Sequence, residues 1–590
     1  MSSNRVLHQA SYAIALVICV VAGCNNIVGL DKIKVSDDPA NPAGGSPGGA
    51  TSGAGSDSPN GGDAGMVMAT GGVGNSSGGD SRGMAGEAGS MDMPGDCTTN
   101  QECTDRAEAE DMGVAGAAAE VVATASVCVK TPIAHCARLL SADCTTVTGN
   151  YLDKNAIVIG SLFSTKGATA ATNLLRQQSA ELAVEQINAA GGIPSNSTSA
   201  NGRPLVMVSC DESTDLIRAA THLVTDLHVP AIVGPNTSQD TLDVSTKVTV
   251  PGGTVVMSPT GVASSIASLS DNDLTWLMVP SDVQRAPLMI SQIGAIEQTL
   301  KAARSKDTLK LGVLFRNDAL GIGTRSSLND LVFNGASLAS PVNLNNSVQI
   351  DAYTGTDATQ ATLVAKYVAF APDIIVLAGT AEAITKLMQP IEAAWTAPDK
   401  PSYVLIDSTK VGELLTALTN NEGLRARVRG TGITSGPTGK NTPGETFNGF
   451  LLDYNVRYGA AATTVSGISG IGPAHDAAYA IGLALAATRT LPISGASVAQ
   501  GLRKLAGGAT ILEANGTNVL AAFQKLSSGD KITAVGTFGM LDWDPNGAVQ
   551  GGTLEMWCVS GPATKPAFAS SGLMFDIKSQ TKSGAYVQCP

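Results

Sequence analysis

The chain has 590 residues, of which 43% are hydrophobic and 4% aromatic, and its formal net charge at pH 7 is -13. This length exceeds one ordinary domain and the apolar content suffices for a large core, so we expect two lobes and additional segments. The acidic charge and the lack of a Lys/Arg cluster argue against a nucleic-acid partner, because binding phosphates requires a positive surface.

The first 23 residues have the pattern of a signal peptide. Arg5 gives a positive start, residues 13–22 are apolar, and the segment closes with Val21-Ala22-Gly23-Cys24. These last four residues resemble a bacterial lipobox, which predicts a diacylglycerol on Cys24 and a membrane anchor through that lipid. An ordinary secretory signal with a chance cysteine is the alternative. Asn25 stands where Asp usually retains such lipoproteins at the inner membrane, which slightly favours the outer membrane.

A low-complexity segment follows, and we assign residues 24–96 to a disordered tether. It is rich in Gly, Ser and Ala, and no aromatic residue occurs between Tyr12 and Tyr151. Such a composition buries too little surface to offset the entropy of the chain. Its low-complexity part, residues 36–95, has about 60 residues, and a flexible chain of that length has an r.m.s. span of roughly 40 Å, which would hold the folded part away from a membrane.

Eight cysteines lie beyond Cys24 in the sequence. They are Cys97, Cys103, Cys128, Cys136, Cys144, Cys210, Cys558 and Cys589. An even number in an exported chain predicts disulfides, and their pairing cannot be read from the sequence. Five of them fall in residues 97–150, which we assign to a small cap stapled by disulfides. A zinc site is the competing interpretation, but the segment has no Cys-x-x-Cys and His135 is its single histidine.

From Asn155 onward, apolar strand-like runs alternate with amphipathic helical stretches. The strand-like runs cover residues 156–162, 204–210, 231–233, 254–257, 309–315, 373–377 and 402–406. This alternation predicts right-handed βαβ units and therefore an α/β fold with two doubly wound parallel-sheet lobes. Residues 477–487 are almost all small or apolar, but the run is too short to span a membrane and predicts a buried core helix.

Five further segments occur in the order typical of a known family. They cover residues 160–167, 180–193, 232–238, 256–260 and 541–547. The ordered set resembles the type I periplasmic binding proteins, in particular the leucine/isoleucine/valine-binding branch, the substrate-binding components of ABC transporters for branched-chain amino acids. No single segment is decisive, and the resemblance covers neither the tether nor the cap.

The resemblance implies that residues 151–590 form two lobes with a ligand held between them. Lobe 1 would span about 155–286 and 433–540, and lobe 2 about 287–432 and 541–590. Three crossover segments would join them, near 284–290, 428–436 and 536–545. Closure of the lobes around a small molecule would be the functional motion.

The resemblance also assigns contacts for an amino-acid-like ligand. Ser238, Thr260 and Gly261 match the loops that hold the ligand carboxylate and backbone groups, although Val262 replaces a family threonine nearby. Asp407 matches the acidic residue that pairs with the ligand ammonium, and a carboxylate at the end of a strand is a poor core residue unless it is paired. Helix capping is the alternative role for Ser238, and also for Asp407 or Ser408.

Three aromatic contacts of the family are missing. Their positions align with Thr172, Leu320 and Thr380, so much of the wall around an aliphatic side chain is lost. We therefore expect a small polar ligand and do not predict a branched-chain amino acid.

The family commonly has a cysteine at the position of Cys210. Its usual partner position, near Thr237, holds no cysteine here. We therefore expect Cys210 to pair with a cysteine of the cap and Cys558 to pair with Cys589.

Catalytic and metal motifs are weak. The sequence offers no Ser/His/Asp or Cys/His constellation, so we expect neither an enzyme nor a cofactor. The segment from Asp542 begins like a calcium loop but has Thr553 where a bidentate glutamate is needed, and we predict no metal.

Two functions remain. The first is a lipid-anchored solute-binding protein of the cell envelope that delivers its ligand to an inner-membrane permease. The second is a sensor or structural lipoprotein with the same fold and no transporter. The long tether and Asn25 favour the second, whereas the fold resemblance favours the first.

Overall fold

The computed structural model describes most of the chain beyond the predicted tether. The described residues are 97–112, 124–131, 133–167, 169–195, 202–354, 357–459, 465–488, 492–587 and 589. The predicted signal peptide, Cys24 and the tether lie outside them. Within these ranges, no helix is both long enough and apolar enough to cross a membrane.

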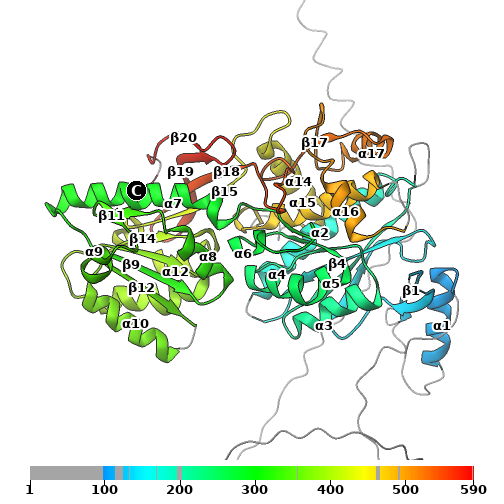
Figure 1. The fold of residues 1–590 in the computed structure, drawn as a ribbon, viewed down its shortest axis with the longest axis horizontal. Helices are drawn as coiled ribbons and strands as arrows, with labels where there is room; N and C mark the ends of the chain where they lie inside the picture. The colour runs from blue at the N-terminus through cyan, green and yellow to red at the C-terminus, as the bar shows by residue number, and fades with distance from the viewer. Residues whose placement is uncertain are drawn as a thin grey trace, which may run out of the picture. The chain divides into compact units, whose positions relative to one another are not determined.

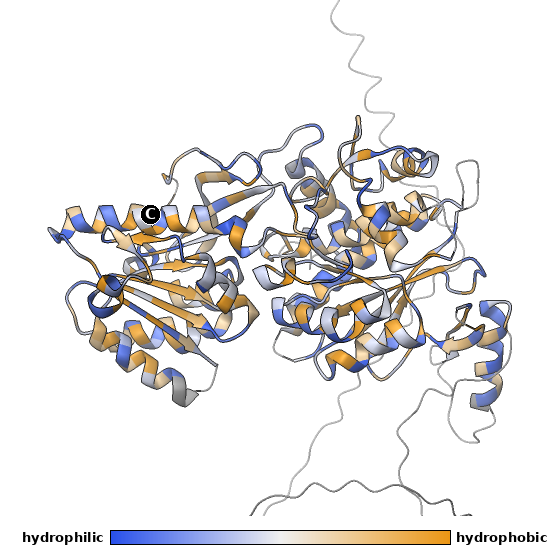
Figure 2. Cartoon of the chain, in the orientation of Figure 1, coloured by the Kyte–Doolittle hydropathy of each residue, from blue (hydrophilic) through white to orange (hydrophobic). Residues whose placement is uncertain are grey.

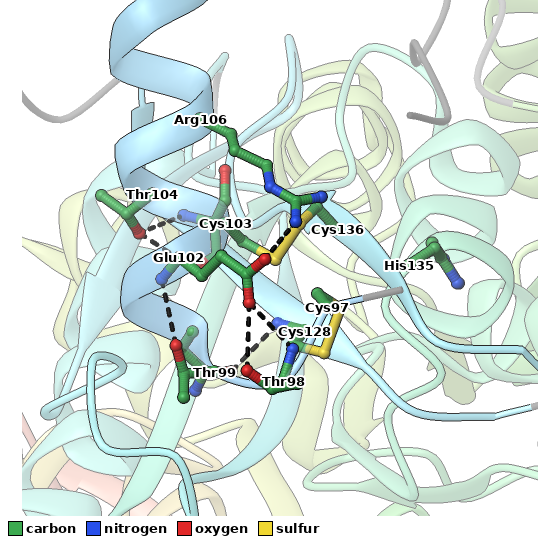
Figure 3. Close-up of a disulfide and its surroundings, with 12 residues drawn as sticks. Cys97, Thr98, Thr99, Glu102, Cys103, Thr104, Arg106, Cys128, His135 and Cys136 are labelled. Atoms are coloured by element: carbon green, nitrogen blue, oxygen red, sulfur yellow. Dashed lines mark hydrogen bonds and ion pairs between the residues drawn. A yellow bond between two sulfur atoms is a disulfide. The ribbon is translucent and has the colours of Figure 1, made fainter. Parts of the chain in front are cut away.

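The described residues of the predicted cap include a helix and a hairpin, shown in Figure 1. Helix α1 (Asn100–Met112) lies against strands β1 (Ser126–Val129) and β2 (His135–Arg138), which pair antiparallel. Disulfides Cys97–Cys128 and Cys103–Cys136 join the start of α1 to the hairpin (Figure 3). Three cap sulfur atoms, those of Cys97, Cys103 and Cys128, lie within 4.8 Å of one another. Because each is bonded to another sulfur, none offers the thiolate that a zinc site requires.

The first sheet has six strands in the order β3-β5-β4-β6-β7-β8. Its strands are β3 (Cys144–Thr148), β4 (Ile157–Phe163), β5 (Leu205–Asp211), β6 (Ala231–Val233), β7 (Val255–Ser258) and β8 (Thr275–Leu277). All neighbours run parallel except β3, which pairs antiparallel with β5. The four strands predicted between residues 156 and 257 are therefore confirmed. Strand β3 belongs to the segment assigned to the cap, and disulfide Cys144–Cys210 ties it to β5.

Helices follow the strands of the first sheet, as βαβ connections require. They are α2 (Ala170–Ala189), α3 (Leu216–Thr221) with its continuation His222–Asp226, α4 (Ser238–Val244) with its continuation Ser245–Thr249, α5 (Val250–Gly252) and α6 (Ser264–Ala267). One apolar core joins α2 to the sheet and a second joins α3 and α4 to it. Helices therefore cover both faces, and the strands read as continuous apolar runs in Figure 2.

The second sheet has eight strands in the order β12-β9-β13-β14-β15-β18-β19-β20. They are β9 (Leu311–Arg316), β12 (Val348–Tyr353), β13 (Ile374–Ala378), β14 (Ser402–Leu405), β15 (Val428–Thr434), β18 (Thr553–Ser560), β19 (Ala567–Asp576) and β20 (Thr581–Ser583). The first five in spatial order are parallel, and β18, β19 and β20 add antiparallel. Disulfide Cys558–Cys589 holds β18 to the end of the chain, as predicted.

Further elements surround the second sheet. They are α7 (Asp282–Arg304), α8 (Ala319–Ser327), the hairpin β10 (Val332–Phe333) and β11 (Ala336–Ser337), α9 (Pro341–Asn346), α10 (Asp357–Phe370), the helical turn Ala383–Met388 with α11 (Gln389–Ala394), η5 (Asp407–Thr409), α12 (Gly412–Leu418) and α13 (Glu422–Arg425). Helix α7 begins at a capping box of Ser281 and Gln284. Two apolar cores again cover opposite faces of the sheet.

After β15 the chain returns to the core of the first sheet. The returning elements are α14 (Pro443–Tyr458), α15 (Ile471–Ala487), α16 (Gly495–Leu502), β16 (Thr510–Glu513), α17 (Val519–Ser528) and β17 (Ile532–Val535). All residues of α15 are buried, and this helix packs against α2, so the predicted core helix is confirmed. Trp543 also belongs to this core, against Trp276, although the resemblance placed residue 541 onward in lobe 2.

Candidate functional site

A cavity of about 260 Å³ lies where the second sheet meets the N-terminal end of α15. Such a volume is close to the lower end of small-molecule sites. The second sheet contributes the ends of β14 and β15 and part of β18, while α14 and the segment leading into α15 form the opposite wall. The lining residues are Asp407, Lys410, Ile433, Thr434, Ser435, Gly436, Phe447, Ser466, Gly467, Ile468, Ser469, Gly470, Ile471, Gly472, Pro473, Thr537, Phe538 and Glu555.

Asp407 is the predicted site residue that lines this cavity. It follows the carboxyl end of β14 and its side chain is buried. The Ser469 hydroxyl donates a hydrogen bond to Oδ2 at 3.1 Å, and the Arg285 guanidinium lies 3.7 Å from the same oxygen. Neither contact reaches Oδ1. Asp407 makes no capping bond at η5, and the Ser408 hydroxyl donates to the Gly379 carbonyl, so the capping alternatives are not seen.

A second carboxylate, that of Glu555 on β18, lines the same cavity. The Lys410 ammonium lies 3.6 Å from its Oε1. Burial raises the pKa of Glu555, and the nearby Asp407 carboxylate adds to this effect, while Lys410 opposes it. The site therefore holds two buried acids and one lysine.

Arg176 of α2 supports the opposite wall of the cavity. Its Nε and Nη2 donate to the Ser469 carbonyl at 2.9 and 2.6 Å, and its Nη1 donates to Asn173 at 2.7 Å. Burial lowers the pKa of Arg176 to about 10. Ser469 thus joins Arg176 of the first lobe to Asp407 of the second, through its carbonyl and its hydroxyl.

The predicted contacts from the first lobe lie outside the lining of this cavity. Ser238 is buried, and its Oγ accepts hydrogen bonds from the backbone N–H groups of Val262 and Ala263 at 3.0 and 3.3 Å. Thr237, not Ser238, caps α4, so the capping alternative for Ser238 is wrong. The Thr260 hydroxyl donates to the Asn236 carbonyl, and the Gly261 N–H donates to the Ser258 hydroxyl at 3.1 Å.

The three positions that lack family aromatics lie on α2, on α8 and in the loop after β13. Thr172 is half-buried on α2, and Leu320 on α8 packs against a core of the second sheet. The Thr380 hydroxyl accepts a hydrogen bond from Arg316 at 3.0 Å and contacts Glu382. None of them lines the cavity described above.

Sequence reasoning missed the buried acid Glu212, which follows the carboxyl end of β5. Its Oε1 accepts from the Ser164 hydroxyl at 3.1 Å, while its Oε2 is buried without a hydrogen-bond partner among the described residues. Burial, together with the nearby Asp240 and Asp211, raises the pKa of Glu212 to about 8. Its position directly after a predicted strand is the same signal that identified Asp407, and it could have been found that way.

Comparison with known proteins supports the fold. The leucine-binding protein LivK from Thermotoga maritima MSB8 matches with a TM-score of 0.50 at 13% identity, over 70% of this chain and 98% of that one. The LivJ protein from Streptococcus pneumoniae str. Canada MDR_19A, solved with isoleucine, matches with a TM-score of 0.48 at 19% identity, over 70% of this chain and 99% of that one. A solute-binding protein from R. palustris, solved with benzoate, matches with a TM-score of 0.46 at 12% identity, over 74% of this chain and 99% of that one.

No family model and no curated protein matches this sequence. The likeness to the Thermotoga protein therefore concerns the fold alone. The two sheets of mainly parallel strands, each covered by helices, agree with it. The chain has the fold of the type I periplasmic binding proteins.

Proposed function

We propose that this chain is an extracytoplasmic solute-binding protein that holds a small polar, amino-acid-like ligand in the Asp407 cavity. The observation that carries the proposal is a buried carboxylate that lines a cavity bounded by both lobes. Burying a carboxylate is costly unless a cation or hydrogen bonds compensate it. Both contacts of Asp407 reach Oδ2, so Oδ1 is the oxygen offered to a ligand cation.

Ligand binding at this position can drive lobe closure. Asp407 belongs to the second sheet, whereas Ser469 leads into α15, which packs in the core of the first. A ligand between them favours the closed arrangement because it contacts both lobes only in that state. The loops that carry Ser238, Thr260 and Gly261 would have to rearrange to reach the ligand. The hydroxyl of Ser238 could then donate a hydrogen bond to it, because this hydroxyl acts only as an acceptor in its contacts with Val262 and Ala263.

The proposal includes lipid anchoring through Cys24 and delivery of the ligand to an inner-membrane permease. The lipobox-like segment supports the anchor, and the fold supports solute binding. The proposed location is the bacterial cell envelope, with the outer membrane slightly favoured.

A sensor or structural lipoprotein without a transporter is the second candidate. One observation favours it. Arg285 and Ser469 already contact Oδ2 of Asp407, so residues of the protein itself partly compensate the carboxylate that a transported ligand would be expected to bind.

Screening by thermal shift tests the proposal. We expect at least one member of a panel of amino acids and amines to raise the melting temperature, because a ligand that binds only the native state stabilises it. D407N should abolish that shift, and D399N, at a more exposed carboxylate outside the cavity, should preserve it. A shift of equal size in D407N would contradict the role of Asp407.

The anchor is tested separately. C24S should release the full chain from membranes into the soluble fraction, and continued membrane association would contradict lipidation.

A further inference from the structure

Two helices of lobe 1 lie directly against a helix of lobe 2. Helices α4 and α6 follow β6 and β7 of the first sheet, whereas α8 follows β9 of the second, and α8 contacts both of them (Figure 1). The side-chain carbonyl of Gln239 on α4 accepts a hydrogen bond from the backbone N–H of Ala319, at the start of α8, at 3.2 Å. The lobes are therefore joined at this point by their own residues.

Apolar packing accompanies this hydrogen bond. Ala263, Ile266 and Leu277 of lobe 1 form one buried cluster with Ala319 of lobe 2. Moving the lobes apart would expose this apolar surface to water, which is unfavourable. The cluster therefore favours the arrangement in which the lobes are closed.

The shape of α8 permits the close approach. Gly323 lies one turn after Ala319 and is buried. A Cβ atom at Gly323 would lie only 3.3 Å from the Cα atom of Ala263, and it would collide with the Asp282 carboxylate. Because glycine has no side chain, the backbone of α8 can pack against the backbone of a loop in the other lobe.

A second contact joins the lobes beside the cavity. The Ser469 hydroxyl, from the segment that leads into α15 of lobe 1, donates to Asp407 of lobe 2 at 3.1 Å. Arg176 on α2 holds the Ser469 carbonyl in place from within lobe 1. The two contacts use different segments of each lobe, and two points of attachment restrict a hinge motion more than one does.

We propose that these two contacts form a latch that holds the lobes closed without a ligand. The latch comprises the Gln239–Ala319 hydrogen bond with its apolar cluster, and the Ser469–Asp407 hydrogen bond. Contacts that exist only between closed lobes shift the equilibrium toward the closed state in the same way as a bound ligand does. A ligand would then enter the Asp407 cavity during transient openings. The inference goes beyond the proposed solute-binding function, because it concerns the lobes alone.

Distances between two spin labels, measured by double electron–electron resonance on the full chain, test the latch. The labels are attached to noncanonical residues at Thr225 in lobe 1 and at Ala365 on α10 in lobe 2, which are both exposed, so the disulfides stay intact. Dialysis against urea, at a concentration below the unfolding transition, removes bound small molecules. We expect one narrow population of distances for the wild-type chain, because the latch selects one arrangement of the lobes.

Variants of the two contacts provide the comparison. A319E places a charge in the apolar cluster, and S469A removes the hydroxyl that reaches Asp407. We expect each variant to add a population at longer distances, and the double variant to be the most open. The matched control S326E, at an exposed position on the same helix α8, should keep the wild-type distribution.

Two results would overturn the latch. One is a wild-type distribution that already matches that of the double variant. The other is a narrow wild-type distribution that neither A319E nor S469A changes. S469A decides the matter if A319E does not fold, since it removes a single hydroxyl group. Neither result depends on whether the thermal-shift screen finds a ligand, so failure of the latch and failure of the proposed function are distinguishable.

Discussion

The loops at the carboxyl ends of the two sheets differ in how their polar groups are used. The first rim comprises residues 164–167, 212–215, 234–238 and 259–263, after β4, β5, β6 and β7. The second rim comprises residues 379–382, 406–410 and 435–442, after β13, β14 and β15. In the first rim, the hydroxyl of Ser238 accepts hydrogen bonds from the backbone N–H groups of Val262 and Ala263. In the second rim, Asp407 faces a cavity. Loops at the carboxyl ends of two similar sheets can therefore serve internal packing or an open site.

The largest expected effect on stability comes from removing Asp407 in the second rim. D407A should lower the free energy of unfolding by about 3–5 kcal/mol, because it removes the carboxylate that lies 3.7 Å from the buried Arg285 guanidinium. Urea denaturation measures the change. D399A removes a more exposed carboxylate and should cost less than about 1 kcal/mol. Equal costs for the two variants would show that the Arg285 contact contributes nothing.

The next largest expected effect is a pH dependence of the free energy of unfolding, caused by Glu212 in the first rim. The pKa of Glu212 is about 8 in the folded protein, against an ordinary value of 4.5. The folded state therefore retains a proton that the unfolded state loses, so the stabilisation is full below pH 4.5 and disappears as pH rises to 8. Each pH unit in this window should lower the stability of the wild type, relative to E212Q, by up to about 1.4 kcal/mol.

Denaturation at pH 5, 6, 7 and 8 measures this difference. Asp282, whose pKa burial raises to about 7, is present in both proteins, so its contribution cancels. Parallel stability curves for wild type and E212Q would contradict the buried protonated state.

A smaller effect distinguishes the roles of the two rims. S238A should cost about 1–3 kcal/mol of stability, because two backbone N–H groups lose their acceptor. The ligand affinity of S238A should change far less than that of D407N. S268A, on the exposed surface, should change stability by less than about 0.5 kcal/mol. If S238A and D407N lose affinity equally, Ser238 contacts the ligand as the resemblance implied.

The smallest effect is expected for Thr260. T260V keeps the shape of the side chain but loses the hydrogen bond to the Asn236 carbonyl, which should cost about 1 kcal/mol. The melting temperature measures it. The Thr260 methyl group also packs against Gly470, where a Cβ atom would lie 2.1 Å from it. A much larger loss would therefore mean that Thr260 supports the Gly470 segment through more than this bond.

The sequence predicted the α/β fold because strand and helix periodicities are local properties. It also placed Asp407 correctly at a strand end, although its role as a ligand residue stays a prediction. Glu555 was missed because β18 reaches the site only through antiparallel pairing with β15, and register between distant segments cannot be read from periodicity. Arg176 and Arg285 were missed for a related reason: their partners, Ser469 and Asp407, are far away in the sequence.

The disulfides of the cap also determine how the protein would respond to a mechanical load. A force applied at Cys97 passes through sulfur to Cys128, across a sequence separation of 31, and later from Cys144 to Cys210, across a separation of 66. The enclosed residues cannot be extended while these bonds are intact. Tension from the N-terminal side would therefore reach β5, inside the first sheet, before β4 could be pulled out of it.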